Sequence, residues 1–207
     1  MKKKVLTAVL MSICALFVGF SCTVIQKKTT MSTETKKLVI FFSHTGENYN
    51  VGVIEKGNTH IIADMIADVT GADRFEIKPV ADYPKSYNEC IDVAKKELNA
   101  KARPAVKEDI AIEDYDVIFI GYPNWWGDVP MCVYTFIEKH DWTGKTVIPF
   151  ITHEGSGMGG TDRNIAKACK GADVAVGKGL AVQGKVAQTN QSSAQQSVKR
   201  WLNGLGY

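Results

Sequence analysis

An unbroken apolar run that ends in hydroxyl and glycine residues is the feature that most limits how this chain can fold. Leu38–Phe42 is apolar throughout, Ser43-His44-Thr45-Gly46 follows it, and Gly57-Asn58-Thr59 opens an amphipathic helix. A continuous apolar run is typical of a strand buried on both faces of a parallel sheet. Because free N–H groups and the positive end of a helix dipole meet behind such a strand, this turn is expected to bind an anion. An ordinary strand-to-helix turn with polar caps is the alternative.

The alternation of strand, turn and helix continues along the chain. Apolar runs predict strands at 39–42, 73–80, 116–121, 146–152 and 173–181. Apolar residues at helical spacing predict helices at 59–69, 85–102, 130–140, around 165–168 and at 191–202. Strands alternating with helices in this way predict an α/β fold, a doubly wound parallel sheet with helices on both faces. Ligands of such sheets bind at the carboxyl ends of the strands, which selects the loops at 43–59, 121–130 and 152–160.

The first loop offers neutral donors for a phosphate, the hydroxyl groups of Ser43, Thr45 and Thr59. It has neither the Gly-Lys-Ser/Thr of a P-loop nor the G-x-G-x-x-G of a dinucleotide turn. Glu47 is expected to point away, because a carboxylate repels a phosphate.

The other two loops differ in the surface that they present. Trp125 and Trp126 can either cap the core or form a flat stacking surface, and their place after a strand favours stacking of a planar ring. The glycines between Thr152 and Gly160 allow the backbone to approach a ligand closely. His153 beside Glu154 suggests a catalytic dyad, but adjacent side chains on an extended chain point apart, so acid–base catalysis is not favoured.

A phosphate turn, an aromatic loop and a backbone-rich loop at one sheet edge fit flavin mononucleotide (FMN). At this point the sequence, from Lys37 to about Gly184, resembles a flavodoxin, and most closely the flavodoxin-like proteins of anaerobic bacteria. Residues 42–46 with 57–59 resemble the phosphate signature Ser/Thr-x-Thr-Gly-x-Thr, split by an insertion at 47–56. Residues 121–127 and 152–157 resemble the two flavin loops of that family.

The resemblance implies a five-stranded sheet of order 2-1-3-4-5 and a set of cofactor-binding residues. The phosphate would contact Ser43, His44, Thr45, Gly46, Asn58 and Thr59. The ring would be lined by Pro123, Asn124, Trp125, Trp126 and Gly127. The polar edge of the ring would meet Thr152, His153, Glu154, Gly155 and Gly157. Because of the insertion, either Thr45-Gly46 or Gly57-Asn58 forms the tight phosphate turn. No catalytic residue and no metal ligand is predicted.

The expected function is electron transfer, with the flavin carrying the redox chemistry. An FMN-dependent NAD(P)H oxidoreductase acting on quinones or similar small acceptors is the alternative. A flavin-free receiver domain is disfavoured, because Phe41-Phe42-Ser43 supplies no acidic residue at the end of the first strand. A further hypothesis is that Gly127 permits a peptide flip, through which a carbonyl accepts the proton gained at flavin N5.

Charge and cysteine content narrow the class of partner. Without Lys2, Lys3 and Lys4 the 25 basic residues become 22, equal to the 22 acidic ones. A near-neutral body argues against nucleic-acid binding and against a strongly acidic docking surface. The expected partner is a redox protein or a membrane electron donor.

There is no C-x-x-C motif, and Cys90, Cys132 and Cys169 are expected to be small buried hydrophobic residues.

The amino terminus predicts export. Three lysines precede an apolar run, Val5–Phe20, which is shorter than the roughly 20 residues of a spanning helix and ends at Ser21-Cys22. We expect a signal peptide at 1–21, a flexible tether at 22–36 and a flavodoxin-like domain at 37–207. Lipidation at Cys22 would make a bacterial lipoprotein that faces the periplasm or the cell exterior. The alternatives are a simple signal peptide cut near Ser21, or a cytoplasmic protein whose translation starts at Met31.

Overall fold

The structure is a computed structural model that describes residues 35–207. The predicted signal peptide at 1–21, the predicted lipidation site Cys22 and nearly all of the tether at 22–36 lie outside the described residues. Within the described part, no helix combines the length and the apolar character that crossing a membrane requires.

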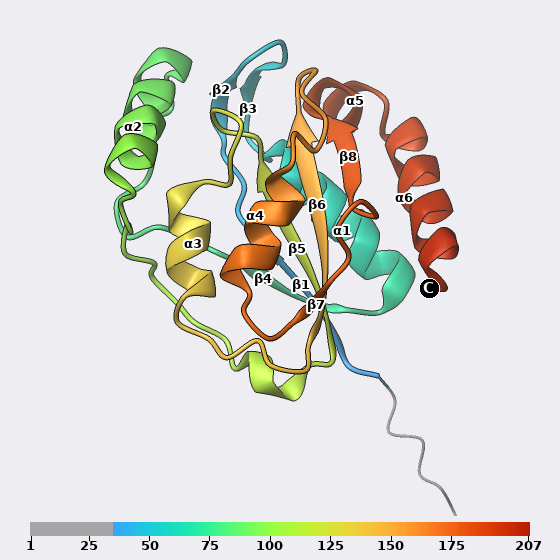
Figure 1. Ribbon diagram of the computed structural model, residues 1–207. Helices are drawn as coiled ribbons and strands as arrows, with labels where there is room; N and C mark the ends of the chain where they lie inside the picture. The colour runs from blue at the N-terminus through green and yellow to red at the C-terminus, as the bar shows by residue number, and fades with distance from the viewer. Residues whose placement is uncertain (1–34) are drawn as a thin grey trace, which may run out of the picture. The chain divides into compact units, whose positions relative to one another are not determined.

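A parallel sheet forms the centre of the fold, as the apolar runs predict. Its strands follow the order β4-β1-β5-β6-β7, with β8 also paired to β6 (Figure 1). The long members are β1 (Lys37–Phe41), β4 (Asp73–Glu76), β5 (Val117–Pro123) and β6 (Thr146–His153). Counted by the predicted strands, this arrangement is the order 2-1-3-4-5. The strand order reverses between β1 and β5, so their carboxyl ends form the switch point.

The fifth predicted strand, 173–181, is divided in the structure. Its pieces are β7 (Asp173–Val174) and β8 (Leu180–Gln183), which pair with different parts of β6. Between them Gly177 has φ of 76° and donates its N–H to the Asp162 carboxylate at 2.8 Å. A residue with positive φ interrupts a β-ladder, so the prediction of one continuous strand is wrong.

The helices lie where the apolar spacing predicts them, with shifted ends. They are α1 (Asn58–Thr70), α2 (Tyr87–Ala100), α3 (Met131–Ile137), α4 (Thr161–Ala168) and α6 (Gln191–Leu205). Helix α2 ends before the predicted boundary because Lys101 adopts a left-handed conformation, with φ of 48°. Two short helices were not predicted, the 3-10 helix η1 (Ile112–Asp114) and α5 (Gly184–Thr189).

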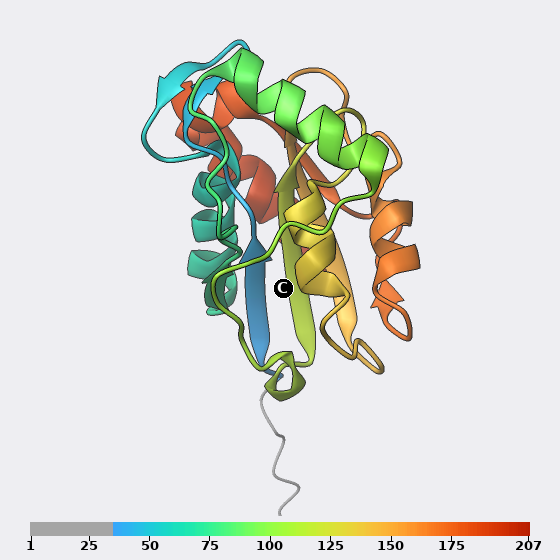
Figure 2. The same ribbon diagram turned by 90° about the vertical axis from the view of Figure 1, so that its left-hand side faces the viewer.

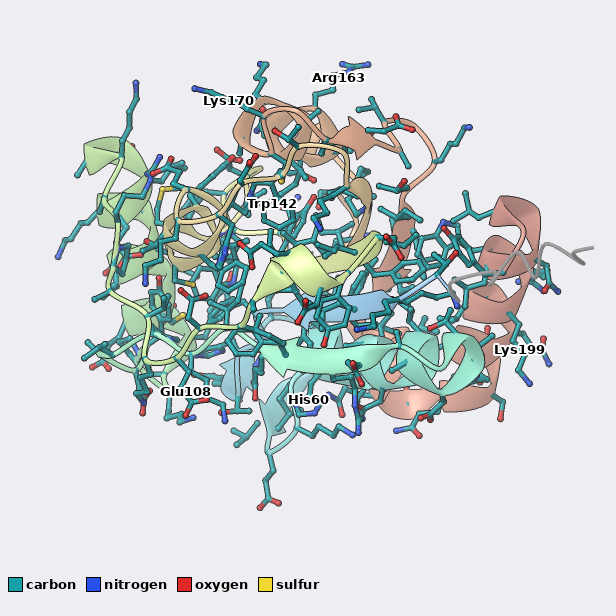
Figure 3. All side chains as sticks on the ribbon, turned by 90° about the horizontal axis from the view of Figure 1, so that it is seen from below. His60, Glu108, Trp142, Arg163, Lys170 and Lys199 are labelled. Atoms are coloured by element: carbon teal, nitrogen blue, oxygen red, sulfur yellow. The ribbon has the colours of Figure 1, made fainter. Side chains whose placement is uncertain are left out.

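Two apolar cores cover the two faces of the sheet. Successive residues of β1 alternate between them, with Leu38 and Ile40 in one core and Val39 and Phe41 in the other. Helices α1 and α6 cover one face, and α3 and α4 lie on the opposite side of the sheet (Figures 1 and 2). The core on the side of α3 and α4 contains Cys90, Cys132 and Cys169, each buried and free, as predicted. Figure 3 shows Trp142 in the interior and Arg163, Lys170 and Lys199 pointing outward.

The insertion at 47–56 forms a hairpin outside the main sheet. Strand β2 (Gly46–Asn48) pairs antiparallel with β3 (Gly52–Ile54). The second predicted strand, 73–80, is shorter than expected. It ends at Glu76, and Pro79 makes only an isolated bridge to Val106.

Candidate functional site

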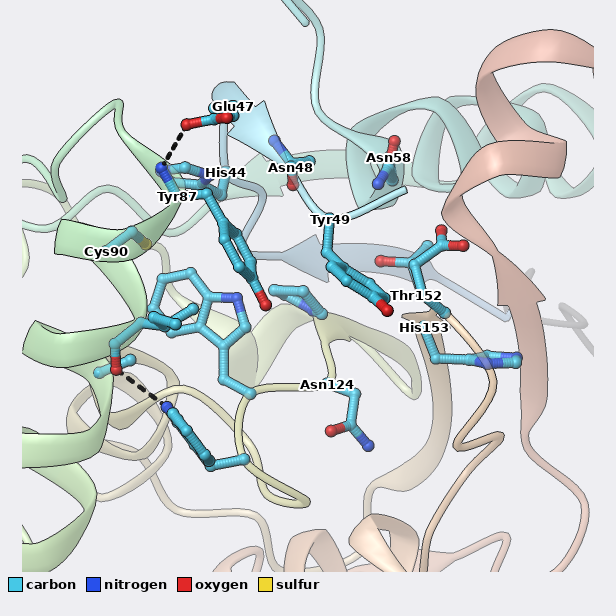
Figure 4. Close-up of a pocket in the computed structure, with 16 residues that line it drawn as sticks. His44, Glu47, Asn48, Tyr49, Asn58, Tyr87, Cys90, Asn124, Thr152 and His153 are labelled. Carbon is cyan, nitrogen blue, oxygen red and sulfur yellow. Dashed lines mark hydrogen bonds between the residues drawn. The ribbon is translucent and has the colours of Figure 1, made fainter. Parts of the chain in front are cut away.

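A cleft of about 230 Å³ opens at the carboxyl ends of β1, β5 and β6. Nine of its lining residues were predicted from the sequence: His44, Asn58, Pro123, Asn124, Trp125, Trp126, Thr152, His153 and Glu154. The others come from the hairpin and from α2, and were not predicted: Glu47, Asn48, Tyr49, Tyr87, Cys90, Ile91 and Ala94. Figure 4 shows these side chains converging from both sides of the cleft.

The end of β1 and the start of α1 meet despite the hairpin between them. Gly57 is the N-cap of α1, and Ser43 Oγ accepts the His60 N–H at 3.1 Å. A Cβ at Gly57 would lie 2.1 Å from Ser43 Oγ, so only glycine permits this approach. Gly57-Asn58 therefore forms the helix start, whereas Gly46 begins β2.

This junction carries unpaired donors. Among residues 35–207, the backbone N–H groups of His44, Thr45, Asn58 and Thr59 have no hydrogen-bond acceptor. The last two belong to the first turn of α1, where the helix dipole is positive. Unpaired N–H donors at the start of a helix can bind an anion, so residues 43–45 with 57–59 form a candidate anion-binding turn.

Two side chains of the anion-binding turn are held by distant segments. Thr59 Oγ1 shares a hydrogen bond of 2.7 Å with Thr152 Oγ1, and both residues are buried. Asn58 Oδ1 accepts from Gln188 Nε2 at 2.9 Å, and a Cβ at Gly184 would lie 2.2 Å from Asn58 Nδ2. The unpredicted helix α5 thus fixes the orientation of Asn58.

Several predicted residues do not line the cleft. Thr45 faces a second cavity of about 270 Å³, where its hydroxyl accepts from Lys85 Nζ, and Ser43 also lines that cavity. Thr59 lies beneath the cleft, buried against Thr152. Four glycines that were predicted by resemblance do not line the cleft either: Gly46, Gly127, Gly155 and Gly157.

The two tryptophans have different roles. Trp125 packs edge-to-face on Phe42, His44 and Tyr83, with centroid distances of 5.3, 5.9 and 4.7 Å. Trp126 is 48% exposed and donates Nε1–H to the Ile91 carbonyl at 2.9 Å. Trp125 therefore packs against the core, which is one of the two roles predicted for the pair, and Trp126 is exposed, as the other role requires.

The turn after Trp125 is tight and strained. Trp126 and Gly127 have φ of 56° and 78°, and Trp125 and Asp128 exchange two backbone hydrogen bonds of 3.1 Å. Positive φ at both central residues is the pattern of a type I′ turn, and it is uncommon for a side chain as large as tryptophan. Asn124 Oδ1 accepts the Gly127 N–H at 3.0 Å, which ties the turn to β5.

Asn124 also presents an unused donor. Its Nδ2 atom is buried and has no hydrogen-bond partner among the described residues. A buried amide without a partner is costly, and a ligand that offers an acceptor beside the cleft would satisfy it. This free donor indicates that the cleft can accept a ligand with a hydrogen-bond acceptor.

Burial lowers the pKa of both histidines that line the cleft. Burial lowers the pKa of His44, whose Nε2–H donates to the Pro84 carbonyl at 2.9 Å. Burial also lowers the pKa of His153, against the opposing charge of Glu154. His153 Nδ1 accepts the N–H groups of Gly155 and Gly157, at 2.9 and 3.1 Å.

Adjacent side chains diverge, as the extended chain predicts. Glu154 Oε1 accepts the Lys185 N–H at 2.8 Å, whereas His153 Nδ1 accepts the N–H of Gly155 in its own loop. Glu47 accepts the Tyr87 N–H at 3.0 Å, at the start of α2.

Residues 35–207 contain no group of three or more His, Cys, Asp or Glu side chains placed to hold a metal ion.

The fold and the site together define the class of protein. It is a doubly wound α/β protein with a candidate anion-binding turn and an aromatic cleft at the switch point of its sheet. A family model described as Flavodoxin matches residues 36–205. The chain therefore belongs to the flavodoxin family, as the resemblance of its three loops predicts.

Solved structures agree with this assignment. A protein from Bacteroides eggerthii, assigned as a flavoprotein, is 30% identical to this chain, with a TM-score of 0.64. The match covers 84% of this chain and 99% of the Bacteroides eggerthii chain. A similarly assigned protein from Bacteroides uniformis is 28% identical with a TM-score of 0.63, covering 80% and 98%. A Lactobacillus acidophilus flavoprotein in complex with FMN is 20% identical with a TM-score of 0.58, covering 77% and 99%, and shows the fold alone. No curated protein gives a significant match.

Proposed function

We propose that this chain binds FMN in the cleft and transfers electrons. The observation that carries the proposal is the convergence at one sheet edge of unpaired N–H groups at Asn58 and Thr59, an aromatic loop, and the unpartnered Asn124 amide. Membership of the flavodoxin family and the FMN complex of the Lactobacillus acidophilus neighbour support the same cofactor.

The chain would hold FMN by its two ends. The neutral donors at the start of α1 would bind the phosphate, and residues 123–126 with 152–154 would surround the ring. The flavin supplies the redox chemistry, while the protein sets orientation and potential. A cleft with neutral histidines and an apolar wall would disfavour an anionic reduced ring, which lowers its potential.

A carrier role is favoured over an enzyme by the state of the titratable groups. His153 and Glu154 are occupied by backbone N–H groups, as is Glu47. The acceptor atoms used in these bonds are not free to take a proton from a substrate. The observation that favours the alternative, an NAD(P)H oxidoreductase of quinones, is the hairpin beside the cleft, which could shape a substrate site.

Gly127 offers a means of tuning the potential. Its φ of 78° is accessible to glycine, and a flip of the neighbouring peptide would turn a carbonyl toward the ring. We expect Gly127→Ala to shift the two one-electron potentials, measured by redox titration of the flavin-loaded protein. Unchanged potentials would remove this hypothesis.

The cofactor is tested on protein expressed without residues 1–21 and with Cys22→Ser. A yellow protein that releases FMN on heating supports the proposal. A colourless protein that also rejects added FMN overturns it. Steady-state oxidation of NADH or NADPH with a quinone acceptor then separates the two functions, because a carrier alone does not turn over.

The cellular context that we propose follows from the amino-terminal sequence. Lipidation at Cys22 would anchor the domain to a membrane through the 22–36 tether, near a redox protein or membrane electron donor. Mass spectrometry of the native protein distinguishes a diacylated Cys22 from an unmodified chain that begins at Met31.

A further inference from the structure

We propose that Tyr49, in the inserted hairpin, is a ring-contacting residue of this site. The inference rests on the proposed function, because it assumes that the cleft holds the flavin ring. It assigns a role to the segment 47–56, which the family pattern does not account for.

The hairpin is anchored at its base. The Glu47 N–H donates to the Lys85 carbonyl at 2.7 Å, and the Glu47 carboxylate accepts the Tyr87 N–H. A Cβ at Gly46 would lie 2.7 Å from the Lys85 carbonyl oxygen, so the two segments are in close contact. The hairpin therefore has a defined position relative to α2.

The tip of the hairpin is a tight turn. The Val51 N–H closes a turn on the Asn48 carbonyl at 3.2 Å, and Asn50 and Gly52 have φ of 58° and 93°. This turn brings Tyr49 to the cleft and leaves Val53 83% exposed.

Tyr49 is placed as a flat surface rather than as a core residue. Its ring stacks on Tyr87 at a centroid distance of 5.8 Å and an interplanar angle of 29°, yet Tyr49 remains 56% exposed. Both rings line the cleft and point toward the side of Asn124 (Figure 4). Tyr49 is the most exposed aromatic residue among those that line the cleft.

The two tryptophans of the cleft already have other partners. Trp125 packs on the core, while Trp126 bonds α2 and has the Lys95 ammonium 4.2 Å from its ring centroid. The loop 152–160 contains no Phe, Tyr or Trp. A second aromatic contact with the ring would therefore come from another segment, and Tyr49, which lines the cleft, can supply it. The geometry makes Tyr49 part of the cofactor site.

The test compares Tyr49→Ala with a matched variant of the same hairpin, Val53→Ala. Val53 is exposed and does not line the cleft. Dissociation constants for FMN and for riboflavin, which lacks the phosphate, are measured by flavin fluorescence. Tyr49→Ala should weaken both ligands by the same factor, roughly fivefold, the change that corresponds to one aromatic stacking contact. It should also increase the fluorescence of the bound flavin.

Tyr49→Phe should restore both affinities, because it keeps the ring, and Val53→Ala should leave them unchanged. Equal affinities for wild type and Tyr49→Ala would overturn the inference, as would an equal loss in Val53→Ala or no recovery in Tyr49→Phe. Circular dichroism and urea unfolding verify that Tyr49→Ala is folded. A wild-type protein that binds neither flavin overturns the proposed function itself, which is a distinguishable result.

Discussion

At the scale of single residues, Gly57 shows how closely the site is packed. Its φ of −66° is open to any residue, so its constraint is space rather than backbone conformation. A Cβ would lie 2.1 Å from Ser43 Oγ and 2.5 Å from the His44 carbonyl oxygen. The helix start and the end of β1 can meet only because this position has no side chain.

Gly57→Ala should lower the free energy of unfolding by about 1–3 kcal/mol, because backbone atoms must shift. It should also weaken FMN binding. Gly204→Ala is the matched control, since Gly204 lies in α6 with open space around its Cβ position. That change should leave stability unchanged or raise it by roughly 0.5–1 kcal/mol. Urea unfolding of both variants measures the difference, and an unperturbed Gly57→Ala would contradict the packing.

His44 couples stability to pH. Burial and the nearby Lys85 hold its folded pKa below the ordinary value of 6.5, so the unfolded chain binds its proton more readily. The contribution of His44 is therefore present above pH 6.5 and is lost as the pH falls through the folded pKa. His44→Gln should lose less stability than wild type between pH 7.5 and pH 5.5 in urea titrations. Identical losses would show that His44 is not the coupled group. His153 is half-buried, and burial lowers its pKa as well, so a dependence of the same sign remains in the variant.

At the scale of elements, the hairpin and α2 stabilise each other through one carboxylate. The Glu47 oxygen accepts the first N–H of α2, at Tyr87, and its charge lies at the positive end of the helix. The insertion is thus connected to the fold by a helix cap contributed from outside the helix.

Glu47→Ala should cost about 0.5–1 kcal/mol of stability and increase hydrogen exchange in the hairpin. Glu47→Gln, which keeps an acceptor but not the charge, should cost less. Glu89→Ala is the control, because Glu89 is an exposed acidic residue in the same first turn. Equal losses from Glu47→Ala and Glu89→Ala would show that the cap adds nothing beyond charge.

At the scale of the whole molecule, one buried hydrogen bond joins the two ends of the site. Thr59 opens α1, Thr152 lies near the end of β6, and their hydroxyl groups are 2.7 Å apart across 93 positions of sequence. Neither hydroxyl can reach water, because the two residues are 1% and 3% exposed. The pair sets the distance between the anion-binding turn and the glycine-rich loop.

Thr59→Val leaves the Thr152 hydroxyl buried without a partner, which should cost about 1–3 kcal/mol. Thr152→Val should cost a similar amount. The double variant should lose less than the sum of the two, with a coupling energy on the order of 1 kcal/mol. Strict additivity in a double-mutant cycle, measured by urea unfolding, would show that the two hydroxyls act independently.

The sheet and the edge that carries the site were predictable because both depend on local pattern. Unbroken apolar runs at 38–42 and 117–120 indicate strands buried on both faces, and the turns behind parallel strands must share one edge. The divided fifth strand was missed because Gly177 and Gly179 weaken a run without showing whether it breaks. Its break depends on the contact between Gly177 and Asp162 of α4.

By itself, the sequence determined the α/β class, the strand order implied by its family, and which three loops form the site. Only the tertiary structure decided which side chains face the cleft. Thr45 turns to Lys85 and Asn58 is held by Gln188, across 40 and 130 positions of sequence. Tyr49 and Tyr87 meet in the cleft although β3, α1 and β4 separate them in the chain. Hydrophobic period and turn chemistry act over a few residues, whereas side-chain direction in a loop depends on partners that only the folded chain brings near.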